Sequence, residues 1–320
     1  MAKKKKSVKS APKTEVKAVP VKAEKGNSAL IMIIAVIVIA LTAFESIVIV
    51  NNDKQMKKKP VLVGSYKAIY HSVICSVVYN SDYISIDEYV NQIQVQDKMT
   101  GAVKGIFEGK DGQPIWCAET KDGMIFAILK NSNVVWAIKN YKKSAEFTMA
   151  DCQSPSGIVA DSQDNLIIAD SKTGKIFKYN TKGEKLAEFA GYGDGKDKNA
   201  LPIGKIFIDA KDNVFALTGG TCGVKGFTKD GKFLTEFKLL TNEVCQLADI
   251  APTPDGNLYI NYFNGSEVLV YNTKGKLIGR FSKDVTGNFA ISSPGTIAGG
   301  TDGFVYVGTY AVGVFNPIKY

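Results

Sequence analysis

The chain has a single histidine, His71, among its 320 residues, and its five cysteines form no Cys-x-x-Cys pair. Zinc sites need several histidine, cysteine or carboxylate ligands that converge on one point. Nucleophilic catalysis of the Ser-His-Asp or Cys-His kind needs a histidine beside the nucleophile. A lone histidine is more often a structural residue than a ligand. The composition therefore predicts no catalytic residue, no metal site and no cofactor.

The larger, C-terminal part of the chain lacks net charge. The formal charge of +9 arises near the N-terminus, where residues 1–27 hold nine lysines against two glutamates and residues 53–59 hold four lysines against one aspartate. Residues 60–320 carry equal numbers of acidic and basic side chains. Proteins that bind nucleic acid carry a basic stripe or patch. We therefore expect no nucleic acid among the partners.

One long apolar run stands near the N-terminus. Residues 29–51 open with the 22 residues Ala29–Val50, which contain a single charged side chain, Glu45. About 20 apolar residues are enough to cross the hydrocarbon core of a bilayer as a helix. A cleaved signal peptide would have a shorter apolar region that ends at a small-x-small site, and this run does not fit that pattern. The run predicts an uncleaved transmembrane helix.

Lysine bias sets the expected orientation of this helix. Residues 1–28 form a basic tail with few large apolar side chains, which predicts a disordered cytoplasmic segment that contacts membrane lipid. Residues 52–59 form a linker of at most about 30 Å. We expect a single-pass protein of the inner membrane, with a cytoplasmic N-terminus and residues 60–320 in the periplasm or outside the cell.

Glu45 has two interpretations. An acid within a membrane helix usually pairs with a partner or marks a pathway, which makes Glu45 a candidate intramembrane contact with another helix. Alternatively, Glu45 reaches water at the outer interface, because it lies about 9 Å of helix rise before Asn51.

A pattern returns about every 43 residues from Asp82 to the C-terminus, which is the signature of a repeat architecture. Each unit reads as an apolar strand, a turn, an apolar strand, a polar loop, a third strand, a second turn and a fourth strand. Five units close on a phenylalanine, at Phe107, Phe147, Phe189, Phe237 and Phe281. The first turns lie at Ser81-Asp82, Asp122-Gly123, Asp164-Asn165, Asp212-Asn213, Asp255-Gly256 and Asp302-Gly303. Six turns predict an all-β fold, a six-bladed β-propeller of four-stranded antiparallel blades over residues 60–320.

The last unit lacks a fourth strand after Val312–Phe315, and residues 60–64 precede the first full unit without a partner. A propeller removes its exposed sheet edges by closing the ring. We therefore expect residues 60–64 to supply the missing outer strand of the last blade.

The segment Ser154–Phe189 reads SPSGIVADSQDNLIIADSKTGKIFKYNTKGEKLAEF, and the units near Leu201 and Leu247 follow the same pattern. These units resemble the NHL repeats of six-bladed β-propellers. The resemblance implies that fold over residues 60–320. Some NHL propellers are lyases with histidine metal ligands, and others bind RNA through a basic surface. This chain departs from both patterns, since it has one histidine and a neutral repeat region.

The central channel of such a ring is expected to be lined by the starts of the innermost strands. These starts lie near Val73, Ile115, Gly157, Ile203, Asp249 and Gly295. Asp249 is the only acid among them, which is too few ligands for a usual divalent site. An enzyme built on this channel would need an atypical site around Asp249.

The loops between blades and the loops after the second strands lie on one face of a propeller. They offer four candidate protein-binding residues, Tyr192, Asp194, Phe263 and Phe289. Exposed aromatic side chains beside polar groups are typical of protein recognition. The alternative is that these four are ordinary loop residues.

Outside the cytoplasm a disulfide is allowed. Cys222 and Cys245 fall in two loops on the same face of one blade and are the best candidate pair. Cys117 and Cys152, at the starts of neighbouring inner strands, are an alternative pair. Cys75 is then left over and is expected to be a buried thiol.

The leading hypothesis is a membrane-anchored, extracytoplasmic propeller that acts as a non-catalytic protein-binding or scaffold module in an envelope complex. Its expected partners are other envelope or membrane proteins, and membrane lipid through the anchor and the basic tail. One alternative is a propeller enzyme, a hydrolase or lyase, with an atypical channel site. Another is a ligand sensor coupled through the membrane helix and Glu45.

Overall fold

The computed structural model of the chain describes residues 61–67, 73–193, 195–196, 198–199, 203–218, 223–239, 247–262, 267–282, 296–308 and 311–316. The predicted tail, the predicted membrane helix with Glu45 and the linker 52–59 lie outside these residues. Within the described ranges, no helix is long and apolar enough to cross a membrane.

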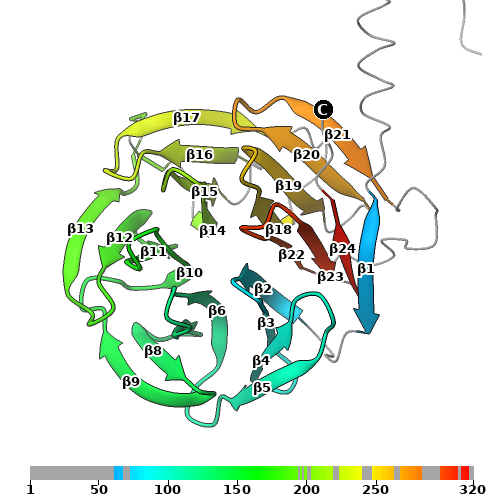
Figure 1. The fold of residues 1–320 in the computed structure, drawn as a ribbon. Helices are drawn as coiled ribbons and strands as arrows, with labels where there is room; N and C mark the ends of the chain where they lie inside the picture. Colours follow the sequence, from blue (N-terminus) through cyan, green and yellow to red (C-terminus); the bar gives the residue numbers. More distant parts are fainter. Residues whose placement is uncertain are drawn as a thin grey trace, which may run out of the picture. The chain divides into compact units, whose positions relative to one another are not determined.

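The described strands form six four-stranded antiparallel sheets, arranged as blades around a central axis (Figure 1). This arrangement confirms the all-β, six-bladed propeller that the repeat predicts. The first blade consists of β2 (Val73–Tyr79), β3 (Asp82–Asp87), β4 (Gln92–Asp97) and β5 (Val103–Glu108). The second consists of β6 (Pro114–Glu119), β7 (Ile125–Leu129), β8 (Val134–Lys139) and β9 (Lys142–Thr148). The third consists of β10 (Pro155–Ala160), β11 (Leu166–Asp170), β12 (Lys175–Tyr179) and β13 (Lys185–Ala190).

The remaining blades follow the same order from the axis outward. The fourth consists of β14 (Ile203–Ile208), β15 (Val214–Thr218), β16 (Gly223–Phe227) and β17 (Phe233–Lys238). The fifth consists of β18 (Leu247–Pro252), β19 (Asn257–Tyr262), β20 (Val268–Asn272) and β21 (Leu277–Phe281). The sixth consists of β22 (Ile297–Gly299), β23 (Val305–Gly308), β24 (Ala311–Phe315) and, outermost, β1 (Leu62–Lys67).

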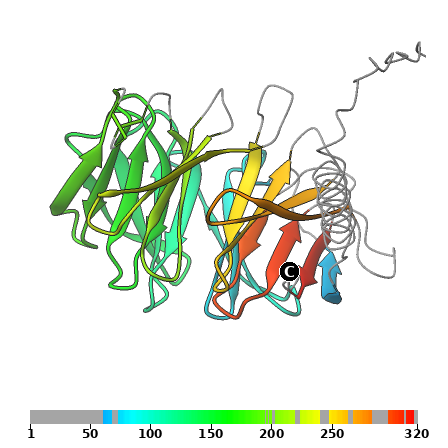
Figure 2. The ribbon, with the colours of Figure 1, turned by 90° about the horizontal axis from the view of Figure 1, so that it is seen from above.

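The sixth blade combines strands from both ends of the described chain. β1 pairs antiparallel with β24, so that Gly64 lies opposite Val314 and Lys67 lies opposite Ala311. Figure 2 shows β1 in blue beside the red strands of this blade. The closing strand therefore begins at Leu62, and its pairing with β24 holds the first and last blades in one ring.

The second strand of a blade packs on both faces. All five residues of β7, β11 and β15 are buried. Apolar side chains from neighbouring blades meet between them, for example Ile167 and Phe227 in one cluster and Phe215 and Tyr271 in another. This packing explains why these strands read as continuous apolar runs in the sequence.

The phenylalanine that closes each unit packs on the next blade. Each ring lies against an aromatic side chain of the neighbour's third strand, with ring centroids 5.6–6.4 Å apart. The pairs are Phe107 with Trp136, Phe147 with Tyr179, Phe189 with Phe227, Phe237 with Tyr271, and Phe281 with Phe315. Such pairs contribute about 0.5–1.5 kcal/mol beyond the burial of their area.

The glycine turns of the repeat lie under the same phenylalanines. Gly183, Gly231 and Gly275 have φ between +77° and +85°. Residues other than glycine rarely adopt this backbone conformation. A Cβ atom at these glycines would lie 2.3–2.6 Å from the rings of Phe147, Phe189 and Phe237. Backbone conformation and ring contact therefore both require glycine at this position.

Where the ring closes, a tyrosine ring instead of a phenylalanine ring lies over a turn glycine. Tyr66 of β1 lies over Gly101, in the turn between β4 and β5, and a Cβ atom at Gly101 would lie 2.4 Å from the tyrosine ring. Tyr66 also packs edge-on against Tyr83 of the first blade, with centroids 6.4 Å apart. Tyr66 therefore takes the place that phenylalanine has in the other blades.

We expect Gly101→Ala to weaken ring closure. Gly101 and Gly256 both have positive φ, +72° and +82°, but a Cβ atom at Gly256 would meet nothing within 4 Å. Gly256→Ala therefore reports backbone strain alone. Urea denaturation should show Gly101→Ala to be less stable than Gly256→Ala by about 1–3 kcal/mol, the usual cost of overpacking. Equal losses in the two variants would contradict the closing contact.

Candidate functional site at the channel

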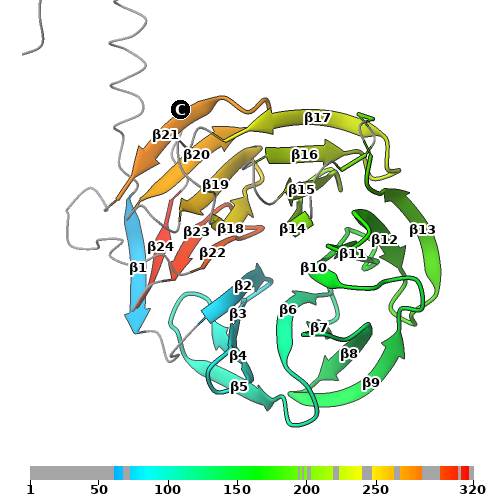
Figure 3. The same ribbon diagram turned by 180° about the vertical axis from the view of Figure 1, so that it is seen from behind.

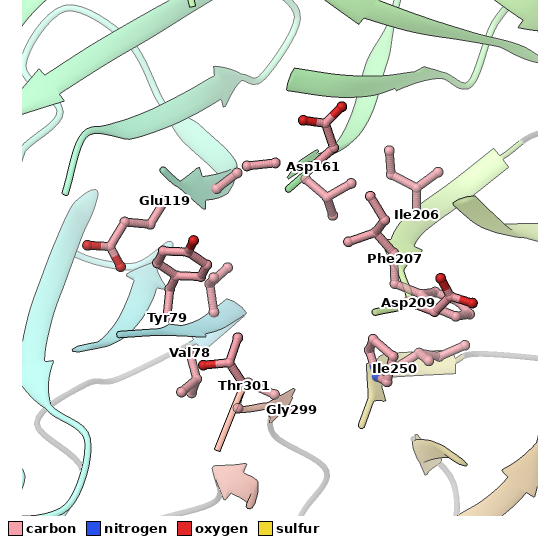
Figure 4. A pocket seen from close by; sticks show the side chains of 18 of the residues that line it. Val78, Tyr79, Glu119, Asp161, Ile206, Phe207, Asp209, Ile250, Gly299 and Thr301 are labelled. Atoms are coloured by element: carbon pink, nitrogen blue, oxygen red, sulfur yellow. The ribbon is translucent and has the colours of Figure 1, made fainter. Parts of the chain in front are cut away.

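The six inner strands, β2, β6, β10, β14, β18 and β22, surround the axis of the ring (Figure 3). A cavity of about 340 Å³ lies where these strands end and their first turns begin. Its wall is largely apolar and includes Val78, Ile158, Phe207, Ile250 and Ile297. The side chains of 18 of its lining residues are drawn in Figure 4.

The expected channel lining is met only in part. Asp249 lines this cavity, as do Trp116 beside Ile115 and Ile158 beside Gly157. Val73 and Ile203 do not line it, and Gly295 lies outside the described residues. Most of the lining comes from the later halves of the strands and from the first turns.

Near the strand starts, side chains from different blades contact each other at equivalent positions of neighbouring inner strands. Trp116, Gly157, Lys205 and Asp249 each follow the irregularity in register near the start of their strand. The Nζ atom of Lys205 lies 4.4 Å from the centroid of the Trp116 ring and 3.5 Å from Oδ1 of Asp249. Gly157 stands between Trp116 and Lys205 around the ring and has no side chain to separate them. We call these contacts the axial bridge.

Asp249 is fully committed to this bridge. Its side chain is 2% exposed, and its two oxygens accept hydrogen bonds from the backbone N–H groups of Ile250 (2.9 Å) and Ile297 (3.3 Å). Burial raises the pKa of the Asp249 carboxyl, and Lys205 and the two N–H groups offset part of that rise. Asp249 therefore connects blades, and three donors from the protein compete with any ligand for its oxygens.

Other acids at the cavity point away from its middle. Figure 4 shows the carboxyl groups of Glu119, Asp161 and Asp209 directed outward from the cavity. Asp161 accepts hydrogen bonds from the N–H groups of Gln163 (2.9 Å) and Asn165 (2.8 Å) and lies 2.7 Å from Lys178 Nζ. Burial alone would raise the pKa of Asp161, but the bonds from Lys178 and Asn165 outweigh it and hold the pKa below its ordinary value.

The same turns are tied to each other. Asp209 accepts hydrogen bonds from the N–H groups of Lys211 and Asn213, at 2.8 and 2.9 Å. Asp164 of the third blade accepts one from the N–H of Lys121 of the second blade, at 2.9 Å. Asp212 likewise accepts one from the N–H of Ser162, also at 2.9 Å. The turn aspartates of the repeat therefore cap turns and join blades.

Glu119 is the exception among these acids, and the sequence reasoning missed it. Its side chain is 5% exposed, and Oε2 is buried with no hydrogen-bond partner. Burial and, to a smaller extent, the Asp82 carboxylate raise its pKa to about 8, although Lys104 offsets part of the rise. Aligning the repeats could have identified it, because Ala160, Ile208, Pro252 and Gly299 end the corresponding strands.

On the loop face, only Tyr192 of the four predicted binding residues is described. Its side chain is 42% exposed, its hydroxyl donates a hydrogen bond to the carbonyl oxygen of Ser171, and its ring lies over Gly174. Asp194, Phe263 and Phe289 lie outside the described residues. Tyr89, in the loop between β3 and β4, belongs to the same face and is 79% exposed. Nothing in the sequence singles out Tyr89 apart from its place after a second strand.

Cys75, Cys117 and Cys152 are buried free thiols. The alternative pair Cys117–Cys152 is therefore not formed. The Cys117 thiol instead shares a hydrogen bond with Cys75, and this contact and burial raise the pKa of Cys117. Burial raises the pKa of Cys152 to about 12. The preferred pair, Cys222 and Cys245, lies outside the described residues.

Within the described ranges, no group of three or more histidine, cysteine, aspartate or glutamate side chains is placed to hold a metal ion. The acids near the axis cap turns or form ion pairs. The cavity thus combines an apolar wall, the axial bridge and a buried carboxyl, that of Glu119, whose Oε2 has no hydrogen-bond partner.

No protein-family model and no curated protein sequence matches the chain. Solved structures share its fold. A streptogramin B lyase has 15% identity and a TM-score of 0.57, covering 79% of this chain and 96% of its own. Virginiamycin B lyase from Staphylococcus aureus has 18% identity and a TM-score of 0.56, covering 77% and 80%. The WD40 repeats of RRP9 have 12% identity and a TM-score of 0.56, covering 79% and 78%. At these identities the likeness shows the propeller fold alone.

We expect the free energy of unfolding to fall as pH rises in the wild type, and Glu119→Gln to remove this part of the fall. The pKa of Glu119 is about 8 in the folded chain against an ordinary value of 4.5, so between these pH values the folded state holds a proton that the unfolded state releases. Stability therefore falls as pH rises through this window. Between pH 5 and pH 9, Glu119→Gln should lose about 4 kcal/mol less than the wild type in urea denaturation.

The control for this measurement is Glu108→Gln, because Glu108 is an exposed acid on β5 that lies 3.4 Å from Lys110. It should follow the wild type at every pH. Parallel pH profiles for Glu119→Gln and the wild type would contradict the raised pKa of Glu119.

We expect a double-mutant cycle to measure the axial bridge. Lys205→Met should cost about 3 kcal/mol, because it leaves the Asp249 carboxyl buried without its cation. Asp249→Asn in the same chain should recover part of this loss, since a neutral amide needs no cation. Lys211→Met, at an exposed turn lysine, should cost less than about 0.5 kcal/mol. Additive losses at positions 205 and 249 would contradict the bridge.

Proposed function

We propose that the chain is a membrane-anchored, non-catalytic binding or scaffold module of the cell envelope. In this proposal residues 29–51 form the anchor, the N-terminus is cytoplasmic and the propeller stands in the periplasm or outside the cell. The partners are other envelope or membrane proteins, with membrane lipid at the anchor and the basic tail. The apolar run and the lysine distribution support this placement.

One observation carries the non-catalytic part of the proposal, the commitment of Asp249 to the axial bridge. The ion pair with Lys205 and two backbone hydrogen bonds use its oxygens. Asp161 and Asp209 are occupied in turns. A catalytic acid or base must come within hydrogen-bond reach of the substrate, and these three carboxyl groups already serve the fold.

The loop face supports protein binding. Tyr89 and Tyr192 both expose their rings there, in the loop between β3 and β4 and in the loop after β13. Glu88 beside Tyr89 lies 3.3 Å from Lys130 of the second blade. Large aromatic side chains with charged neighbours are common at the centres of protein interfaces.

Glu119 favours a second candidate, a hydrolase or lyase with an atypical channel site. A buried carboxyl with a pKa of about 8 is protonated at neutral pH and suits a general acid. The carboxyl group of Glu119 lies near Tyr79, however, and points away from the cavity (Figure 4). Two lyases are among the proteins of similar structure, but their sequence identity is so low that the likeness shows a shared fold only. The binding module is therefore the better supported candidate.

A third candidate is a ligand sensor coupled through the membrane helix. It depends on Glu45, which lies outside the described residues. Loss of a co-purifying membrane subunit in Glu45→Ala would support it, and an unchanged complex would remove its basis.

We expect a mild-detergent purification of the full-length chain to recover a stoichiometric envelope protein. Tyr89→Ala should weaken that complex by about 30-fold in Kd if Tyr89 is an interface hot spot of about 2 kcal/mol. Leu234→Ala is the matched control, because Leu234 is an exposed apolar residue on the outer strand β17, away from the loop face. Equal binding by both variants would remove the loop face from the proposal, and purification of the chain without any envelope partner would contradict the scaffold function.

A further inference from the structure

The outer strands of the propeller differ in the side chains that they expose. β9, β13 and β17 expose lysine and glutamate, including Lys142, Lys185, Glu188 and Glu236. β13 and β17 each add one exposed leucine among these charges, Leu186 and Leu234. Single apolar side chains of this kind are normal on a protein surface.

β1 and β5 expose more apolar side chains. Val63 of β1 is 41% exposed, and Val103 and Ile106 of β5 are 48% and 45% exposed. The charged side chains of β5 are paired: Lys104 lies 2.5 Å from Asp82 and 3.6 Å from Asp97, and the exposed Glu108 lies 3.4 Å from Lys110.

These side chains belong to one continuous surface. The ring of Tyr66 lies over Gly101, and a Cβ atom at Gly64 would lie 3.9 Å from the carbonyl oxygen of Met99, so β1 touches the turn before β5. The ring of Tyr141 lies over Gly105 of β5. We call this surface the β1–β5 strip; its exposed members are Val61, Val63, Met99, Val103, Ile106 and Tyr141.

The strip lies where the chain enters the propeller. β1 is the first described strand, and it follows the linker 52–59 and the predicted membrane helix 29–51. Eight linker residues span at most about 30 Å. If residues 29–51 are the anchor, the propeller is tethered through β1, one of the two strands that carry the strip.

We propose that the β1–β5 strip rests on the bilayer interface, so that the propeller stands edge-on to the membrane. This inference rests on the proposed membrane anchoring. Apolar and aromatic side chains gain free energy when they enter the headgroup and acyl boundary. An edge-on propeller leaves two faces open to partners: the loop face and the opposite face, which carries the first turns of the blades. A propeller lying flat on the membrane would cover one of them.

Tryptophan fluorescence in proteoliposomes tests the strip. Ile106→Trp and Leu234→Trp are matched variants, since both parent side chains are 45% exposed on outer strands, β5 of the first blade and β17 of the fourth. The two native tryptophans, Trp116 and Trp136, are buried and supply a constant background. Full-length protein is reconstituted in vesicles that contain anionic lipid, with either ordinary or brominated acyl chains, because bromine quenches nearby tryptophan.

We expect brominated lipid to quench the added fluorescence of Ile106→Trp at least twofold more than that of Leu234→Trp. Vesicle flotation is measured on the same samples and reports the anchor separately. If the chain floats and both variants are quenched equally, the strip proposal is wrong while the anchoring stands. If the chain does not float with the vesicles, both the membrane anchoring and the strip proposal are wrong. A detergent-stable dimer that Ile106→Asp dissociates would assign the strip to a second copy and would also overturn the proposal.

Discussion

Every blade depends on an aromatic ring that it presents to its neighbour. The rings of the outer strands lie against the third strand of the next blade and, in most blades, over a turn glycine. Such a contact leads from each blade to the next, so it is satisfied throughout only when the sixth blade returns to the first. Tyr66 over Gly101 makes this last contact, and the pairing of β1 with β24 places it there.

Closure has a consequence at the centre of the ring. Near the strand starts, Lys205 lies against Trp116 and Asp249, so that three different blades are joined, while Gly157 leaves space between two of them. The acids beyond this bridge turn outward to cap the first turns. These contacts join blades at the centre of the ring, and the proposed binding module therefore uses the loop face and the outer edge.

The sequence predicts local features well because they repeat. Aspartate turns, glycine turns and closing phenylalanines recur in successive units, and together they give the fold, the number of blades and the closing strand. The axial bridge could not be predicted in this way, because Trp116 and Lys205 are far apart in the sequence and do not recur. Glu119 departs from the repeat and could have been found by aligning it. Most of the predicted loop-face residues lie outside the described part, so they remain predictions.

The central claim is that the channel carboxyl serves the fold and that function lies on the surface. Calorimetric titration of the full-length protein with Ca²⁺, Mn²⁺ and Zn²⁺ tests this claim most directly. We expect no saturable binding that depends on Asp249, because Lys205 and two backbone N–H groups already contact its oxygens. Stoichiometric binding of any of these ions that Asp249→Asn abolishes would contradict it and would indicate an enzyme site in the channel.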